Sequence, residues 1–220
     1  MSDESRFSLE EIKATAQRLV SAGKDVRSKL DELTVRALTQ RDLAEKEVRE
    51  VLTAITEGVS LGAAERADEV RSALGDALHG IDDALSHAAE AIQLALGEAS
   101  SRTQEFAEND LKQGLSELKN LESLFLETVG HVAQGANGLI RDELDALLTH
   151  TRNTGTGAGD RVRAVTEELG NRLRATAAEA SDAGKRAALE VGARVATLAS
   201  RKLGEAAERI AKKAEELKNN

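Results

Sequence analysis

The chain has 220 residues with a net charge of -9, and 31% of the residues are charged. Proline, cysteine, tryptophan and tyrosine are absent, which excludes disulfides and every metal or catalytic site that uses a cysteine thiolate. The remaining composition favours helices with a thin core built from Ala, Leu, Val and Ile, because the abundant residues are strong helix formers.

Charge is distributed unevenly along the chain. Residues 1–159 hold 17 basic and 29 acidic groups, whereas residues 160–220 hold 13 basic and 10 acidic groups. The acidic body argues against nucleic acid as a partner, since phosphates are bound by clustered Lys and Arg. The N-terminus is polar and acidic, unlike a signal peptide, and no run of about 18 apolar residues occurs. We therefore expect a cytoplasmic protein without a transmembrane segment.

The first predicted helix follows a short tail at residues 1–8. Ser8 and Glu11 have the spacing of a capping box, in which each side chain accepts a hydrogen bond from the other residue's backbone N–H. An amphipathic helix is predicted over residues 9–38. A second capping signal at Thr39 is consistent with a turn, a kink or an uninterrupted helix.

The most specific pattern lies in residues 39–107, which we predict to be one long helix. Branched aliphatic residues recur there every eleven positions, and a leucine series accompanies them. The residues of this apolar stripe are Val48, Val59, Val70, Ile81 and Ile92, together with Leu52, Leu74, Leu85 and Leu96. Eleven residues complete about three helical turns, so the side chains line up along one edge of the helix. Small residues beside the stripe, such as Gly62 and Ala84, permit close approach of another helix.

Residues 108–152 change to a seven-residue period, which is typical of left-handed coiled-coil packing. Leu118 and Phe125 are among its apolar positions. Gly138 lies in a cluster of glycine and asparagine residues, which indicates a helix break followed by a short helix. Residues 153–159 contain three glycines, and we interpret them as a hinge.

The eleven-residue period returns in residues 160–220, which we predict to form an Ala-rich, weakly basic helix. Leu173, Val191 and Val195 occupy its apolar stripe. All the stripe residues named above are candidates for binding an apolar surface or a partner helix, because an exposed aliphatic stripe of this length must be covered.

Two patterns suggest chemistry, and both are better explained without it. His79, Asp83 and His87 are spaced by four residues and could face a metal, but a mixed-charge face is the ordinary covering of an amphipathic helix. The glycine-rich segment lacks the preceding strand and the Gly-Lys-Ser/Thr ending of a phosphate-binding loop. No catalytic motif appears, so we predict a non-enzymatic protein without cofactor or metal.

The sequence resembles apolipoproteins, late-embryogenesis proteins and phasins, and of these the phasins coat polyhydroxyalkanoate granules. The resemblance is carried by the eleven-residue apolar stripe and by the alanine-rich stretch Ala175-Thr176-Ala177-Ala178-Glu179-Ala180. The resemblance rests on period and composition over most of residues 44–107 and 160–217. It implies a self-associating coat on a granule or lipid particle.

An uninterrupted helix over residues 40–130 would extend ~135 Å, so the chain must form a hairpin, oligomerise or adsorb to an apolar surface. The fold class that we expect is all-α, arranged as an extended hairpin or bundle or as a coiled-coil oligomer. Two other functions remain open: a coiled-coil scaffold or filament, and a stress-protective helix that folds conditionally.

Overall fold

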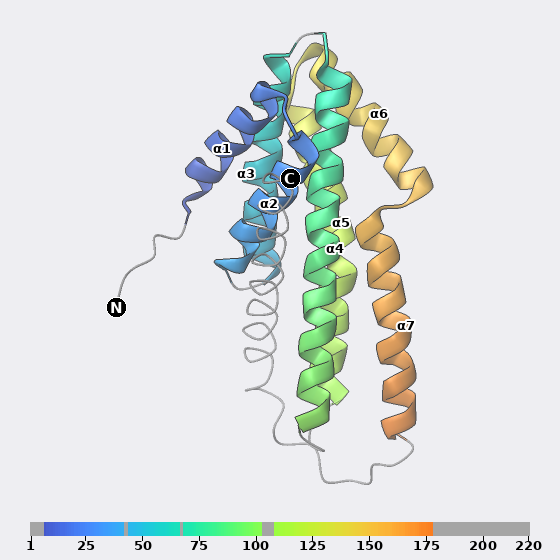
Figure 1. Ribbon diagram of the computed structural model, residues 1–220. Helices are drawn as coiled ribbons and strands as arrows, with labels where there is room; N and C mark the ends of the chain where they lie inside the picture. The colour runs from blue at the N-terminus through green and yellow to red at the C-terminus, as the bar shows by residue number, and fades with distance from the viewer. Residues whose placement is uncertain (1–6, 42–43, 67, 103–107, 178–220) are drawn as a thin grey trace, which may run out of the picture.

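Figure 1 shows a computed structural model of the chain, which describes residues 7–41, 44–66, 68–102 and 108–177. The described residues form helices joined by turns, without a strand, which confirms the all-α class. The helices are α1 (Leu9–Ala22), α2 (Val26–Thr39), α3 (Glu45–Ala64), α4 (Val70–Arg102), α5 (Glu108–Gly135), α6 (Gly138–Thr154) and α7 (Gly157–Ala177).

The helices pack as a bundle with α4 and α5 at its centre (Figure 1). The N-terminal pair lies on one side, where α1 packs along α3 and α2 packs along α4. On the other side α7 contacts both α4 and α5, while α6 contacts mainly α5 near the end of the bundle. The long helices α4 and α5 thus connect the N-terminal helices to the last ones.

Each helix turns one apolar face into a shared core, as expected for amphipathic helices in a bundle. Alanine is the most frequent of the buried hydrophobic residues, and Phe125 is the only aromatic one among those described. The largest fully buried side chains are Ile12, Leu30, Leu38, Leu52, Ile55, Leu74, Ile81, Leu85 and Leu144. The core is therefore made of aliphatic side chains of small and medium size.

The helix predicted over residues 9–38 is divided into α1 and α2. Ser8 and Glu11 form the predicted capping box at its start, so that prediction is confirmed. Gly23 then ends α1 in a left-handed conformation with a φ of 68°, and its N–H donates to the Val20 carbonyl. A left-handed residue is a common helix terminator because glycine adopts it without steric cost.

The single helix predicted over residues 39–107 is wrong, because the chain turns back between Ala64 and Val70. This turn contains neither glycine nor proline, and the eleven-residue period continues through it. Arg66 stabilises the turn by reaching α1, where its Nη1 lies 3.5 Å from the Val20 carbonyl oxygen. The turn lets both halves of the stripe be buried within one chain, which a straight rod in water cannot achieve.

Of the two later boundaries, one agrees with the prediction and one differs. The break expected near Gly138 is confirmed by the ends of α5 and α6. The glycine-rich segment is mostly helical, since α6 continues to Thr154 and α7 begins at Gly157. The predicted helix over residues 160–220 is described as far as Ala177, and its remainder lies outside the described residues. None of the described helices is both long enough and apolar enough to cross a membrane.

Candidate functional site

The structure places the predicted stripe residues in the interior of the bundle. Val48 and Val59 on α3, and Val70, Ile81 and Ile92 on α4, are at most 4% exposed and belong to one core cluster. Leu52, Leu74, Leu85 and Phe125 are buried in the same cluster. The side chains of Leu96, Leu118 and Leu173, and the whole of Val191 and Val195, lie outside the described residues. The described stripe is therefore covered by other helices of the same chain.

Glycines on α3 and α4 allow the backbone of the N-terminal helices α1 and α2 to pack directly against them. A Cβ atom added at Gly58 would lie 2.2 Å from the carbonyl oxygen of Lys13 on α1. A Cβ atom at Gly80 on α4 would lie 2.2 Å from the carbonyl oxygen of Arg27 on α2. Real Cβ atoms do not come so close to an oxygen, so these positions require glycine. Gly62, one of the small residues beside the stripe, makes the same kind of contact, since a Cβ atom there would lie 2.5 Å from the carbonyl oxygen of Gln17 on α1.

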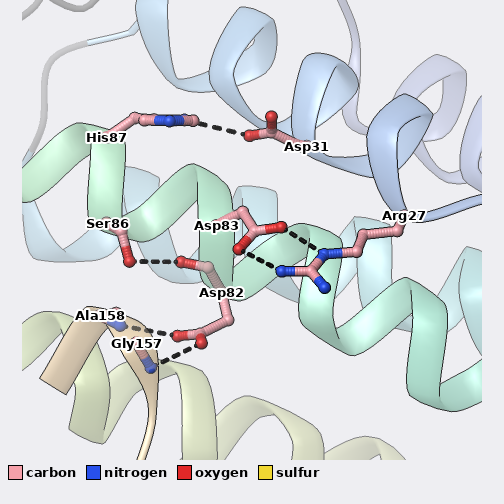
Figure 2. A network of polar contacts seen from close by, with 8 residues as sticks. All are labelled: Arg27, Asp31, Asp82, Asp83, Ser86, His87, Gly157 and Ala158. Atoms are coloured by element: carbon pink, nitrogen blue, oxygen red, sulfur yellow. Dashed lines mark hydrogen bonds and ion pairs between the residues drawn. The ribbon is translucent and has the colours of Figure 1, made fainter. Parts of the chain in front are cut away.

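A set of polar contacts joins α4 to the helices on both of its sides (Figure 2). We call it the α4 network, and its α4 members are Asp82, Asp83, His87 and Glu90. Toward α2, the Arg27 guanidinium binds both carboxylate oxygens of Asp83, at 2.6 and 2.9 Å. Such paired hydrogen bonds between arginine and a carboxylate define orientation as well as distance.

His87 makes the second contact of the α4 network with α2. Its Nδ1 lies 3.3 Å from Oδ1 of Asp31 (Figure 2), and the side chains of the two residues are 33% and 14% exposed. The hydrogen bond with Asp31 raises the pKa of His87 above its ordinary value, although burial acts in the opposite direction. The protonated imidazole is therefore stabilised by the carboxylate across the helix interface.

Toward α7, the carboxylate of Asp82 binds the N-terminus of that helix. Its Oδ2 accepts a hydrogen bond from the Gly157 N–H at 2.7 Å, and its Oδ1 accepts one from the Ala158 N–H at 2.9 Å (Figure 2). These N–H groups have no partner within the helix, and the partial positive charge there favours an anion. Burial nevertheless raises the pKa of Asp82, because it outweighs the two hydrogen bonds that lower it.

A second carboxylate approaches the same helix end from α5. Thr156 accepts a hydrogen bond from the Gly159 N–H at 2.7 Å, as a capping residue does, and its hydroxyl donates to Oε1 of Glu122 at 2.8 Å. A Cβ atom at Gly159 would collide with the Glu122 carboxylate. The segment predicted as a hinge is thus fastened to α4 and α5, and two of its glycines lie next to those carboxylates.

The histidine and aspartate face of α4 differs from the solvated surface that we predicted. Asp83 and His87 pair with α2, and Glu90 lies 2.8 Å from Arg161 on α7, whereas His79 is exposed. Among the described residues, no group of three His, Asp or Glu side chains is arranged to hold a metal ion. What the arrangement can do is hold α2 and α7 against α4, over the apolar stripe.

Sequence reasoning missed the partners in the α4 network because they lie far apart along the chain. Arg27 and Asp31 are each 56 residues from their partners, and Gly157 is 75 residues from Asp82. The only local signal was the run of charged residues on the α4 face, which is equally typical of a solvent-exposed helix. The pairings depend on the turn between α3 and α4, which the sequence did not reveal.

The chain was compared with protein families, curated proteins and solved structures. Residues 2–212 match a protein family of unknown function, DUF6781. No curated protein and no solved structure matches the chain.

Proposed function

The chain belongs to the DUF6781 family, whose function is unknown, and from its own geometry we propose that it is a non-enzymatic cytoplasmic coat protein. It would cover an apolar surface, such as a polyhydroxyalkanoate granule or a lipid particle, by opening its helical bundle. The observation that carries this proposal is the burial of the described part of a regular apolar stripe inside a core of small and medium-sized aliphatic side chains. A stripe of this kind can exchange neighbouring helices for another apolar surface.

The energetic balance supports an exchange of partners. Burying apolar surface is favourable by roughly 25 cal/mol per Å² removed from water, whether the stripe is covered by another helix or by a particle. Alanine is the commonest core residue, and its side chain buries little apolar area. Each helical turn therefore loses little stabilising free energy when the neighbouring helix moves away. Many helical turns adsorbing together restore that loss, and the charged faces stay in water.

The connections between the helices allow the bundle to open while the helices persist. Gly23, Gly138 and Gly155 have φ angles of 68°, 52° and 83°, and each lies at a helix end. Glycine changes φ at low cost, so rotation at these positions reorients whole helices. We therefore expect the helical content to be similar in the closed and adsorbed states.

A flotation assay with a cross-linked variant tests opening directly. The chain has no native cysteine, so Arg27→Cys and Asp83→Cys can be joined by a short bismaleimide that holds α2 on α4. The variant without cross-linker should float with polyhydroxyalkanoate or lipid particles, and the cross-linked variant should remain in the aqueous fraction. The matched control is a cross-link within α4, between Ser72→Cys and Asp76→Cys, which should leave flotation unchanged. Failure of the unlinked protein to bind any apolar particle would rule out the coat.

A self-associating scaffold is the rival proposal, and three exposed side chains favour it. Leu61, Leu94 and Leu139 are 45%, 57% and 53% exposed, and they lie on three different helices. Contacts between copies would cover them. Sedimentation of the particle-free protein separates the two functions, because a scaffold forms defined oligomers whether or not α2 is cross-linked to α4.

A further inference from the structure

Two of the three ion pairs in the α4 network are permanent. Asp83 pairs with Arg27 of α2, and Glu90 pairs with Arg161 of α7. Arginine keeps its charge at every physiological pH. These two contacts therefore keep their strength over the physiological pH range, so any pH dependence in the packing of α2 on α4 must come from the third pair.

The third pair has a cation that can lose its charge. Asp31 has His87 as its partner across the α2–α4 interface, and the side chain of Asp31 is only 14% exposed. A partly buried carboxylate such as that of Asp31 is less well stabilised when its cationic partner loses its charge. Neutral imidazole offers Asp31 at most an ordinary hydrogen bond.

We propose that His87 and Asp31 form a pH-sensitive switch, in which deprotonation of His87 loosens the α1–α2 pair from α3 and α4 and uncovers the apolar stripe. This inference rests on the proposed function, because it names what regulates exposure of the surface-binding stripe. The α1–α2 pair is a cover of defined position, held by the backbone contacts of Gly58 and Gly80.

The direction of the switch follows from the charges that face His87. Asp83 and Glu90 approach it from its own helix and Asp31 from α2, and all three favour the protonated form. Arg27 and Arg161, the nearby cations of α2 and α7, are engaged by Asp83 and Glu90.

The pKa of His87 is raised above its ordinary value of 6.5, mainly by the hydrogen bond to Asp31. Its stabilising contribution is thus complete below pH 6.5 and is lost as the pH rises through the folded-state pKa. The pKa of Asp82 is also raised, by burial, but Asp82 binds the N-terminus of α7 and does not hold the α1–α2 pair. The α1–α2 pair is held more firmly in acid and released toward alkaline pH.

A distance measurement in the absence of particles tests the switch. Nitroxide labels on Glu32→Cys of α2 and Leu94→Cys of α4 lie at exposed positions outside the α4 network. Raising the pH from about 6 to about 8.5 should broaden the distance distribution and move it to longer values. His87→Gln in the same labelled chain should show the alkaline distribution at both pH values.

Two further variants keep the test decisive. Asp31→Asn removes the carboxylate that needs the charge, so it should also abolish the pH response even if His87→Gln folds poorly. His150→Gln, an exposed histidine on α6, should keep the full response. An unchanged response in both His87→Gln and Asp31→Asn would overturn the switch.

Flotation at the two pH values separates the switch from the function on which it rests. Binding of lipid particles that increases with pH in the unsubstituted protein, and not in His87→Gln, supports both proposals. A pH-dependent distance with no particle binding at any pH leaves the switch standing and removes the coat. Particle binding with no pH-dependent distance removes the switch alone.

Discussion

Substituting alanine for Gly58 should increase the separation between α1 and α3 and destabilise the bundle. The new Cβ atom would lie 2.2 Å from the carbonyl oxygen of Lys13 and 2.8 Å from the Cβ atom of Ala16. The first atom belongs to the backbone of α1 and the second is bonded directly to it, so neither can move aside alone. The two helices must therefore separate by about 1 Å to reach ordinary van der Waals contact. Overpacking of this kind costs about 1–3 kcal/mol, whereas alanine in a helix gains about 0.5–1 kcal/mol over glycine. The midpoints of these two ranges differ by about 1 kcal/mol, which is the net loss that we expect in the free energy of unfolding.

Gly75 on α4 provides the matched control, because no atom lies within 4 Å of a Cβ added there. Gly75→Ala should therefore be more stable than the unsubstituted chain by about 0.5–1 kcal/mol. Urea unfolding followed by circular dichroism measures both variants, and the slope m should stay constant. Equal stabilisation by the two substitutions would refute the close helix contact. If the bundle opens to bind, Gly58→Ala should also bind particles more readily than Gly75→Ala does.

Three other substitutions test the core and the attachment of α7. Asp82→Asn should leave stability nearly unchanged in acid, where protonated Asp82 and asparagine each offer one carbonyl oxygen to the N-terminus of α7. As the pH rises through the raised pKa of Asp82, the unsubstituted chain should lose stability relative to this variant, which urea titrations at several pH values measure. Ile81→Asp should place a charge in the core, so its circular dichroism melt should lack a cooperative transition. Leu94→Asp, at an exposed site, should keep the cooperative transition of the unsubstituted chain. Gly159→Ala should destabilise in urea titrations less than Gly58→Ala does, because the flexible Glu122 carboxylate can move aside.

The periodic pattern of the sequence predicted which side chains are buried but not what buries them. Val48 and Ile92 are core residues, as their eleven-residue spacing indicated. The chain reversal at residues 65–69 was not predictable from local signals, because that segment has no helix breaker. Burying the two halves of the stripe in one chain outweighs the loss of a few helical hydrogen bonds there. Tertiary packing, not helix propensity, thus determined where the long helix ends.

The polar contacts were predictable only where they are local. The capping box of Ser8 and Glu11 joins residues three positions apart, and it was recognised from its spacing. The anchor of α7 joins Asp82 to Gly157, which lies 75 residues later in the chain, so the glycines there were interpreted as a hinge. Glycine serves flexibility and close approach equally well, and only the position of the facing carboxylate distinguishes the two uses.

The most direct measurement is the distance between nitroxide labels on α2 and α4, at Glu32→Cys and Leu94→Cys, before and after adding polyhydroxyalkanoate particles at constant pH. If the stripe is hidden inside one chain and released onto a surface, binding should lengthen the distance while circular dichroism shows retained helix. Binding with an unchanged distance would contradict this, because the closed bundle would then be adhering through its outer face.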